Sequence, residues 1–235
     1  MPSLRLALGL ALGLALAAAT LSACSNDPST GSPAQAASPV ATPTASPFES
    51  QFTRDGTYQS HQEIDGIDFV YTIYPTKATP RTNEWFALGD KYFSFTFQAY
   101  DLDRDLRDPF ETKRQVFLNR IRVTSTTQSP SGTSESPYRL SGKAASLTFD
   151  PEPQKGRYGM LVTSPKGAFE IRNQKIGPLA PGTQGVTLTF EAVVNIQREP
   201  GAKGYDADVI TETVPIAIFP GGKTTEVAQV PINSN

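Results

Sequence analysis

Between residues 50 and 235 the chain repeatedly alternates apolar and polar residues, which is the pattern of half-buried β-strands. The two clearest runs are residues 92–100 and 186–197. Their apolar positions are Phe93, Phe95, Phe97 and Ala99 in the first run, and Val186, Leu188, Phe190, Ala192, Val194 and Ile196 in the second. Turn residues at 88–90 and 180–183 precede these runs, so we predict two strongly amphipathic strands.

Six weaker segments follow the same scheme. They are 69–74, 116–124 with Phe117, Ile121 and Val123 facing inward, 138–149 with an irregularity at Ser141-Gly142, 159–163, 168–172 and 213–219. The residues 164–167 between two of them predict a hairpin turn. Pro215 cannot donate a hydrogen bond to a neighbouring strand, so we place the last strand at a sheet edge. The best helix candidate is 110–120, but the β-branched residues just after it favour a strand.

Seven or eight strands separated by Gly/Pro turns indicate an all-β fold. We predict an antiparallel two-sheet sandwich over residues 50–235. Its arrangement resembles the immunoglobulin-like fold, without the paired cysteines of antibody domains. A jelly roll is the alternative.

The N-terminus has a different pattern. After Arg5, residues 6–19 are an unbroken run of Leu, Ala and Gly, the length of a signal-peptide apolar region. The string Leu21-Ser22-Ala23-Cys24 then resembles the lipobox of bacterial lipoproteins. That resemblance implies a signal peptide over 1–23, cleavage before Cys24, and lipid on the Cys24 thiol. The alternative is an uncleaved transmembrane helix, for which the run is near the lower length limit.

Residues 25–49 consist mainly of Ser, Thr, Ala and Pro, and their first large apolar residue is Phe48. A segment with so little apolar surface has nothing to bury. Its recurrent prolines favour extended conformations. We therefore predict a disordered tether over 24–49 between the lipidated cysteine and the domain.

Composition excludes several function classes. The chain has 21 Lys and Arg against 23 Asp and Glu, a weakly acidic balance that argues against nucleic acid as a partner. His61 is the only histidine, and Cys24 is the only cysteine. Histidine-dependent hydrolysis or a histidine-built zinc site therefore lacks the residues it needs. We expect His61 in an exposed loop or edge strand, and we expect no cofactor.

One acidic segment suggests a metal. Asp101, Asp103, Asp105 and Asp108, followed by Glu111, could supply oxygen ligands to Ca²⁺. The spacing begins like an EF-hand loop, but Leu106 and Thr112 occupy the positions of its Gly and Glu. The alternative is a solvated loop with local Asp–Arg pairs, to which Arg114, Arg120 and Arg122 could contribute.

Two further groups could act on glycans. Trp85, Tyr92 and Tyr100 could stack against sugars, or they could simply pack across strands. Glu63, Glu84, Glu170 and Glu191 could support glycoside hydrolysis, which needs two acids at a defined separation. Nothing in the sequence pairs these four carboxylates.

We therefore expect a lipid-anchored protein of the cell membrane that faces the periplasm or the cell exterior. Its expected role is non-catalytic: binding, adhesion or envelope structure, with an envelope protein or a glycan as partner. The alternatives are a carboxylate-dependent glycan-processing enzyme and a calcium-binding adhesion module.

Overall fold

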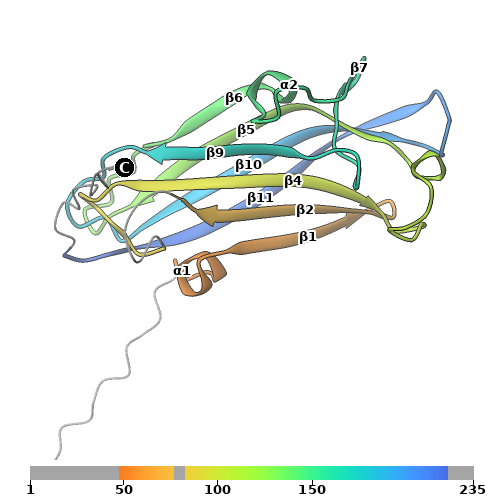
Figure 1. Cartoon of the computed structure of the whole chain (residues 1–235). Coiled ribbons are helices and arrows are strands. Elements are labelled where there is room, and N and C mark those ends of the chain that lie inside the picture. Colours follow the sequence, from red (N-terminus) through yellow and green to blue (C-terminus); the bar gives the residue numbers. More distant parts are fainter. Residues whose placement is uncertain (1–47, 77–82, 222–235) are drawn as a thin grey trace, which may run out of the picture. The chain divides into compact units, whose positions relative to one another are not determined.

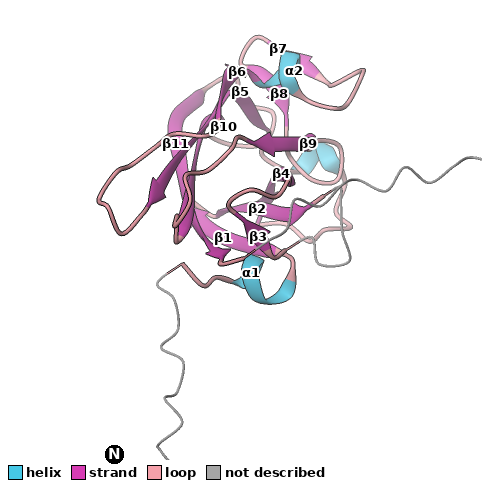
Figure 2. Cartoon of the chain, turned by 90° about the vertical axis from the view of Figure 1, so that its left-hand side faces the viewer, coloured by secondary structure: helices cyan, strands magenta, loops and turns pink. Residues whose placement is uncertain are grey.

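A computed structural model describes residues 48–76 and 83–221 (Figure 1). The predicted signal peptide, Cys24 and the tether up to residue 47 lie outside the described residues. Within them, strands dominate and form two sheets that pack face to face, as Figure 2 shows from one end. The predicted all-β two-sheet sandwich is confirmed.

The smaller sheet has four antiparallel strands. In spatial order they are β1 (Tyr58–Ile64), β2 (Ile67–Pro75), β4 (Lys91–Asp101) and β9 (Phe169–Ile176). The turn between β1 and β2 consists of Asp65 and Gly66, both with positive φ, which is the requirement of a two-residue hairpin turn. The predicted strand 92–100 is thus β4, and it lies inside the sheet between β2 and β9.

The described residues form seven strands in the larger sheet. Six follow the spatial order β3 (Trp85–Phe86), β11 (Tyr205–Phe219), β10 (Gly185–Gln197), β5 (Val116–Gln128), β8 (Gly159–Leu161) and β7 (Lys155–Gly156). The seventh, β6 (Arg139–Lys143), pairs with β5. All pairs are antiparallel except the short β3–β11 pair. The helical segments are α1 (Gln51–Asp55), η1 (Phe110–Thr112) and α2 (Ala144–Leu147).

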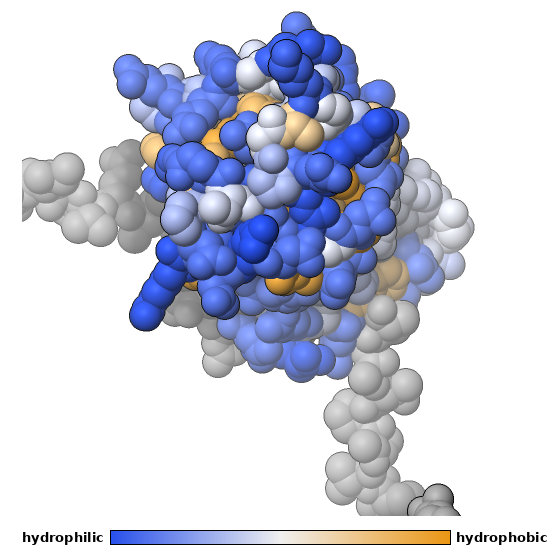
Figure 3. All heavy atoms as spheres, turned by 90° about the vertical axis from the view of Figure 1, so that its right-hand side faces the viewer, coloured by the Kyte–Doolittle hydropathy of each residue, from blue (hydrophilic) through white to orange (hydrophobic). Residues whose placement is uncertain are grey.

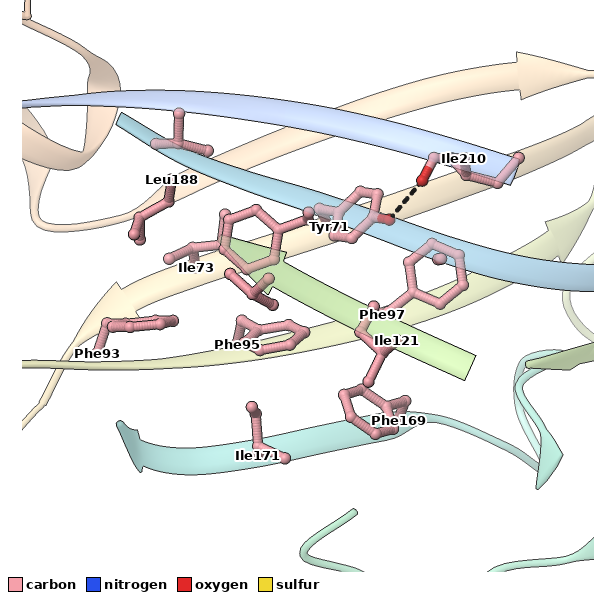
Figure 4. Close-up of a cluster of buried hydrophobic side chains, with 14 of the residues drawn as sticks. Tyr71, Ile73, Phe93, Phe95, Phe97, Ile121, Phe169, Ile171, Leu188 and Ile210 are labelled. Atoms are coloured by element: carbon pink, nitrogen blue, oxygen red, sulfur yellow. Dashed lines mark hydrogen bonds between the residues drawn. The ribbon is translucent and has the colours of Figure 1, made fainter. Parts of the chain in front are cut away.

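Aromatic residues fill the space between the sheets (Figure 4). All the apolar positions predicted for the two strongest strands are buried. Phe95 of β4 meets Phe190 of β10 edge to face at 4.9 Å, so the two sheets contact through their rings. The hydroxyl of Tyr71 on β2 donates to the Ile210 carbonyl of β11 at 3.0 Å and adds a polar tie across the core.

The inward position predicted for Phe117 is wrong. In the pairing of β5 with β10, Leu118 faces Val194 and Arg120 faces Val193, which leaves Asn119 as the extra residue of a β-bulge. Leu118 is consequently buried, and Phe117 lies on the outer surface. There its ring contacts those of Tyr158 and Tyr205.

Two further predictions are corrected. The strand expected over 138–149 ends at Lys143, and the chain then forms the short helix α2. The turn at 164–167 exists, but it does not close a hairpin, because β8 pairs with β5 whereas β9 pairs with β4 in the other sheet. A turn between paired strands and a turn that crosses between sheets use the same residue types, and long-range pairing decides between them.

The edge position is confirmed for Pro215 itself, although β3 adds to the C-terminal end of β11. β11 pairs with β10 from Tyr205 to Ala217, whereas β3 pairs only with Ile218 and Phe219 on the other side. Pro215 therefore lies where the missing N–H leaves no partner unsatisfied.

The folded part of the chain already includes Phe48. Its side chain is only 7% exposed and packs over Gly185 at the start of β10, where a Cβ would collide with the ring. A single apolar residue in a polar segment carries no sequence signal for this packing.

Candidate functional site

The acidic segment after β4 is organised by Arg114. Asp101 is 5% exposed, and its carboxylate receives the Arg114 guanidinium at 2.8 Å and the Arg114 backbone N–H at 2.7 Å. Burial opposes ionisation of Asp101, but the Arg114 hydrogen bonds and charge outweigh it and hold the carboxyl pKa below its ordinary value. Asp101 is therefore engaged in a buried ion pair, and the predicted Asp–Arg pairing is present here.

Of the remaining carboxylates, Asp103 shares the Arg114 guanidinium with Asp101, but the segment does not gather three carboxylates around one point. Asp108 accepts the backbone N–H of Asp105 at 3.0 Å and so closes a local turn. Asp103 is 74% exposed and contacts Arg114 at 3.1 Å. Nowhere in residues 48–76 and 83–221 do three or more His, Cys, Asp or Glu side chains gather as a metal site would require. The end of the sandwich shown in Figure 3 is mostly hydrophilic, with small apolar areas.

The aromatic candidates do not form one platform. Trp85 is 2% exposed and meets Phe52 edge to face at 5.1 Å, so its ring is packed in the core. Tyr92 and Tyr100 are half-buried at opposite ends of β4, on the outer face of the four-stranded sheet. The Tyr100 hydroxyl donates to Gln98, and the Lys175 ammonium lies 5.5 Å from the Tyr92 ring centre.

The candidate carboxylates for hydrolysis lie on separate elements. Glu63 is on β1 and Glu170 on β9, the two edges of the four-stranded sheet, whereas Glu191 is on β10 in the other sheet. Glu170 pairs with Arg172 at 2.5 Å, and Glu191 pairs with Arg122 at 3.3 Å. These contacts engage Glu170 in an ion pair within β9 and Glu191 in an ion pair between β10 and β5.

His61 is exposed on the edge strand β1, and its Nδ1 lies 2.8 Å from an Asp68 carboxylate oxygen. Arg120 and Arg122 are both exposed on β5, as their shared parity predicted. The described helices are too short to cross a membrane.

A different feature offers room for a ligand. A groove of about 370 Å³ lies where β5 ends and β10 begins. This is the left-hand end of the sandwich in Figure 1, which faces the viewer in Figure 2. Its lining consists of Phe48, Thr126, Thr127, Gln128, Ser129, Gly132, Thr133, Ser134 and Thr187.

Two threonines lie side by side on neighbouring strands beneath this groove. Thr126 of β5 is directly opposite Thr187 of β10 in the strand register. Directly opposed residues place their Cβ atoms about 5 Å apart on the same face of a sheet. Neither hydroxyl has a hydrogen-bond partner among the described residues, and the same is true of the Gln128 amide and the Ser134 hydroxyl. The groove therefore presents neutral polar groups that remain available to a ligand.

The loop beside these threonines is held in shape by its other hydroxyls. Ser129 Oγ lies 2.7 Å from Ser131 Oγ, and the Ser131 hydroxyl donates to Thr133. The base of the loop is closed by Thr127, whose backbone N–H donates to the Glu135 carbonyl while its side-chain oxygen accepts the Glu135 N–H. The hydroxyls of Thr127, Ser129, Ser131 and Thr133 thus hold the loop in shape, whereas those of Thr126, Ser134 and Thr187 remain available in the groove lining.

Sequence reasoning missed this site, although one signal was present. Residues 124–136 are rich in Ser and Thr, a composition that also describes an ordinary solvated loop. Two other residues of the groove, Phe48 and Thr187, lie far from this loop along the chain. Thr187 reaches it through the pairing of β5 with β10, and Phe48 by packing over Gly185 of β10.

The groove is thus the candidate binding site among the described residues. It combines rigid strand ends, a hydrogen-bonded loop and neutral polar groups without a partner among the described residues. Comparison of the chain with protein-family models and with curated proteins finds no match.

Proposed function

We propose that this protein is a lipid-anchored extracytoplasmic lipoprotein whose β-sandwich has a non-catalytic binding role, with the groove at Thr126 and Thr187 as its binding site. The observation that carries the binding role is the set of unengaged neutral groups on two paired strands. Groups fixed on strands lose little conformational freedom when a ligand binds, which favours recognition.

The proposed anchor rests on the sequence Leu21-Ser22-Ala23-Cys24 after an apolar run. Each buried methylene of an acyl chain contributes about 0.8 kcal/mol, so two or three chains hold a protein at a membrane durably. The weak negative charge of the protein gives no electrostatic attraction to anionic lipids, so the attachment falls to the lipid.

Metabolic labelling with a fatty-acid analogue tests the anchor. We expect the wild type and Ser25→Ala to be labelled and to fractionate with membranes. Cys24→Ala should lose the label, because its side chain has no thiol to acylate. Equal labelling of Cys24→Ala and the wild type would contradict the lipoprotein assignment.

Site-specific cross-linking tests the binding role without assuming a ligand class. With the Cys24 thiol acylated, Thr126→Cys would introduce the only free thiol of the mature chain. A photoactivatable reagent attached there in intact cells should give a defined adduct. Thr124→Cys, two residues away on the same strand face, is the matched control. Absence of an adduct from position 126, or equal adducts from both positions, would contradict binding at the groove.

Purified full-length protein separates binding from catalysis. We expect saturable binding of a partner. Chromatography of glycans recovered after incubation should show that they are chemically unchanged. Product formation that increases with time would favour the carboxylate-dependent enzyme instead.

A further inference from the structure

We infer that the ligand of this groove is a neutral saccharide, an inference that rests on the proposed binding role and assigns its chemical class. The uncharged lining of the groove favours a neutral ligand. None of the side chains that line the groove is ionisable. An anionic or cationic ligand would lose hydration there without gaining a counter-charge, which is unfavourable.

The hydrogen-bonding groups of the groove match those of a sugar. The unengaged groups are three hydroxyls and one amide, from Thr126, Ser134, Thr187 and Gln128. A hydroxyl both donates and accepts, and a primary amide offers a donor and an acceptor side by side. Sugar hydroxyls have the same dual character, so each can satisfy such a group in either direction. The opposed pair Thr126 and Thr187 can bracket neighbouring hydroxyls of one ring.

The backbone around the groove does not suit a peptide that adds as an extra strand. Such a peptide needs unpaired backbone groups at the edge of a sheet. At this end of β5 the backbone is already used. The Thr127 N–H donates to Glu135 at 2.9 Å, and the Gln128 carbonyl accepts the Gln184 N–H at 2.8 Å. These paired strand ends therefore offer no open edge to an added strand, whereas the unengaged side chains remain available.

The volume of the groove and its apolar contact with Phe48 also suit a short saccharide. Most of the Phe48 ring is buried over Gly185, and its small exposed area adds an apolar contact for the C–H groups of a sugar to an otherwise polar lining. The volume of about 370 Å³ is within the range of small-molecule sites, about 300–1,000 Å³. A short oligosaccharide fits these dimensions, and an open groove accepts a longer chain that extends beyond it.

Ligand-observed saturation-transfer NMR tests this inference on the full-length protein in a detergent without a sugar headgroup. The probes are neutral trisaccharides of glucose, mannose, galactose and arabinose, with an acidic uronic-acid trisaccharide for comparison. We expect saturable transfer to at least one neutral probe and none to the acidic one. Thr126→Val and Thr187→Val keep the shape of the side chain but remove the hydroxyl, so each should weaken binding at least fivefold.

Thr189→Val is the matched control, because Thr189 lies on the same face of β10, is half-buried like Thr187 and does not line the groove. It should leave the affinity unchanged. Equal loss in all three variants would overturn the assignment to the groove, provided that their unfolding midpoints match the wild type. Gln128→Met offers a second variant if either threonine substitution impairs folding.

The outcomes separate this inference from the proposed function. Failure of every neutral probe to bind, with cross-linking at Thr126→Cys intact, would overturn the saccharide class and leave the binding role standing. Loss of both signals would overturn both. Preferential binding of the acidic probe would contradict the argument from charge.

Discussion

At the residue scale, a buried lysine and a partly buried arginine hold the loops at the ends of β4. Lys91 is 1% exposed, and its ammonium donates to the carbonyls of Phe86, Ala87 and Gly89 at 3.1, 3.0 and 2.6 Å. Burial lowers the pKa of Lys91 to about 8. At the other end Arg114 joins Asp101 to the Asp65 carbonyl of the β1–β2 turn. Each charge is satisfied by groups of a loop, so these side chains fix loops that the apolar core does not reach.

The Asp101–Arg114 pair gives a prediction about stability. Asp101→Asn should lower the free energy of unfolding at pH 7 by roughly 3 kcal/mol, because a half-broken buried pair leaves a charge uncompensated. Asp103→Asn, at a carboxylate that is 74% exposed, should cost less than about 0.5 kcal/mol. Urea denaturation of the three proteins measures both differences.

The difference in free energy of unfolding between the wild type and Asp101→Asn should depend on pH. The folded protein holds the Asp101 pKa below its ordinary value, so the stabilisation is present above the unfolded pKa, near 4, and is lost as the pH falls through the folded pKa. The gap between wild type and Asp101→Asn should therefore narrow at pH 3. If this difference in free energy of unfolding stayed constant between pH 7 and pH 3, the Asp101–Arg114 ion pair would not be the source of the stabilisation.

At the scale of elements, side chains join two sheet edges that have no backbone bond between them. Glu212 of β11 accepts hydrogen bonds from Tyr58, Ser60 and Gln62 of β1 at 2.9, 2.5 and 2.8 Å. β1 is an edge of the four-stranded sheet, and β11 is largely an edge of the larger one. This carboxylate therefore closes one side of the sandwich and gives both edge strands a partner.

Removing the carboxylate should loosen this side. We expect Glu212→Ala to lower the free energy of unfolding by about 2 kcal/mol, since three donors lose a charged acceptor and recover only part of the loss from water. Glu63→Ala, on β1 but outside this cluster, should change stability by less than about 0.5 kcal/mol. Similar values for the two variants in chemical denaturation would mean that the cluster does not stabilise the edge.

At the scale of the whole molecule, an aromatic core links the two sheets and includes buried phenols. Burial raises the pKa of Tyr71 and of Tyr138, and burial together with Glu212 raises the pKa of Tyr58 to about 12. The unfolded chain would ionise these tyrosines near pH 10. Above that pH the unfolded state binds fewer protons than the folded state, so stability falls as pH rises.

Tyr71→Phe should reduce this alkaline loss. At pH 7 it should cost about 1 kcal/mol, because the hydrogen bond to the Ile210 carbonyl disappears. Between pH 10 and 11 its free energy of unfolding should fall less steeply than that of the wild type, because one buried phenol has been removed. Fluorescence-monitored denaturation at each pH measures these free energies. If they fell equally steeply with pH in Tyr71→Phe and the wild type, Tyr71 would have no role in the alkaline loss of stability.

The pattern of residues predicted most of the architecture, because strict alternation has one structural meaning. Phe93, Phe95 and Phe97 could only face one side of a strand, and a strand with such a face needs a second sheet to cover it. Pro215 likewise predicted an edge by the chemistry of one missing N–H. These inferences needed no knowledge of distant residues.

The sequence by itself therefore determined the all-β character, the core faces of the strongest strands and an edge position. The tertiary structure decided the rest. A bulge at Asn119 turned Phe117 outward, and the pairing of β8 and β9 with different partners replaced a hairpin with a crossing between sheets. It also brought Phe48 and Thr187 to the loop that follows Thr126. The reason is physical: periodicity is local, whereas bulges, sheet membership and grooves depend on contacts between residues far apart in the chain.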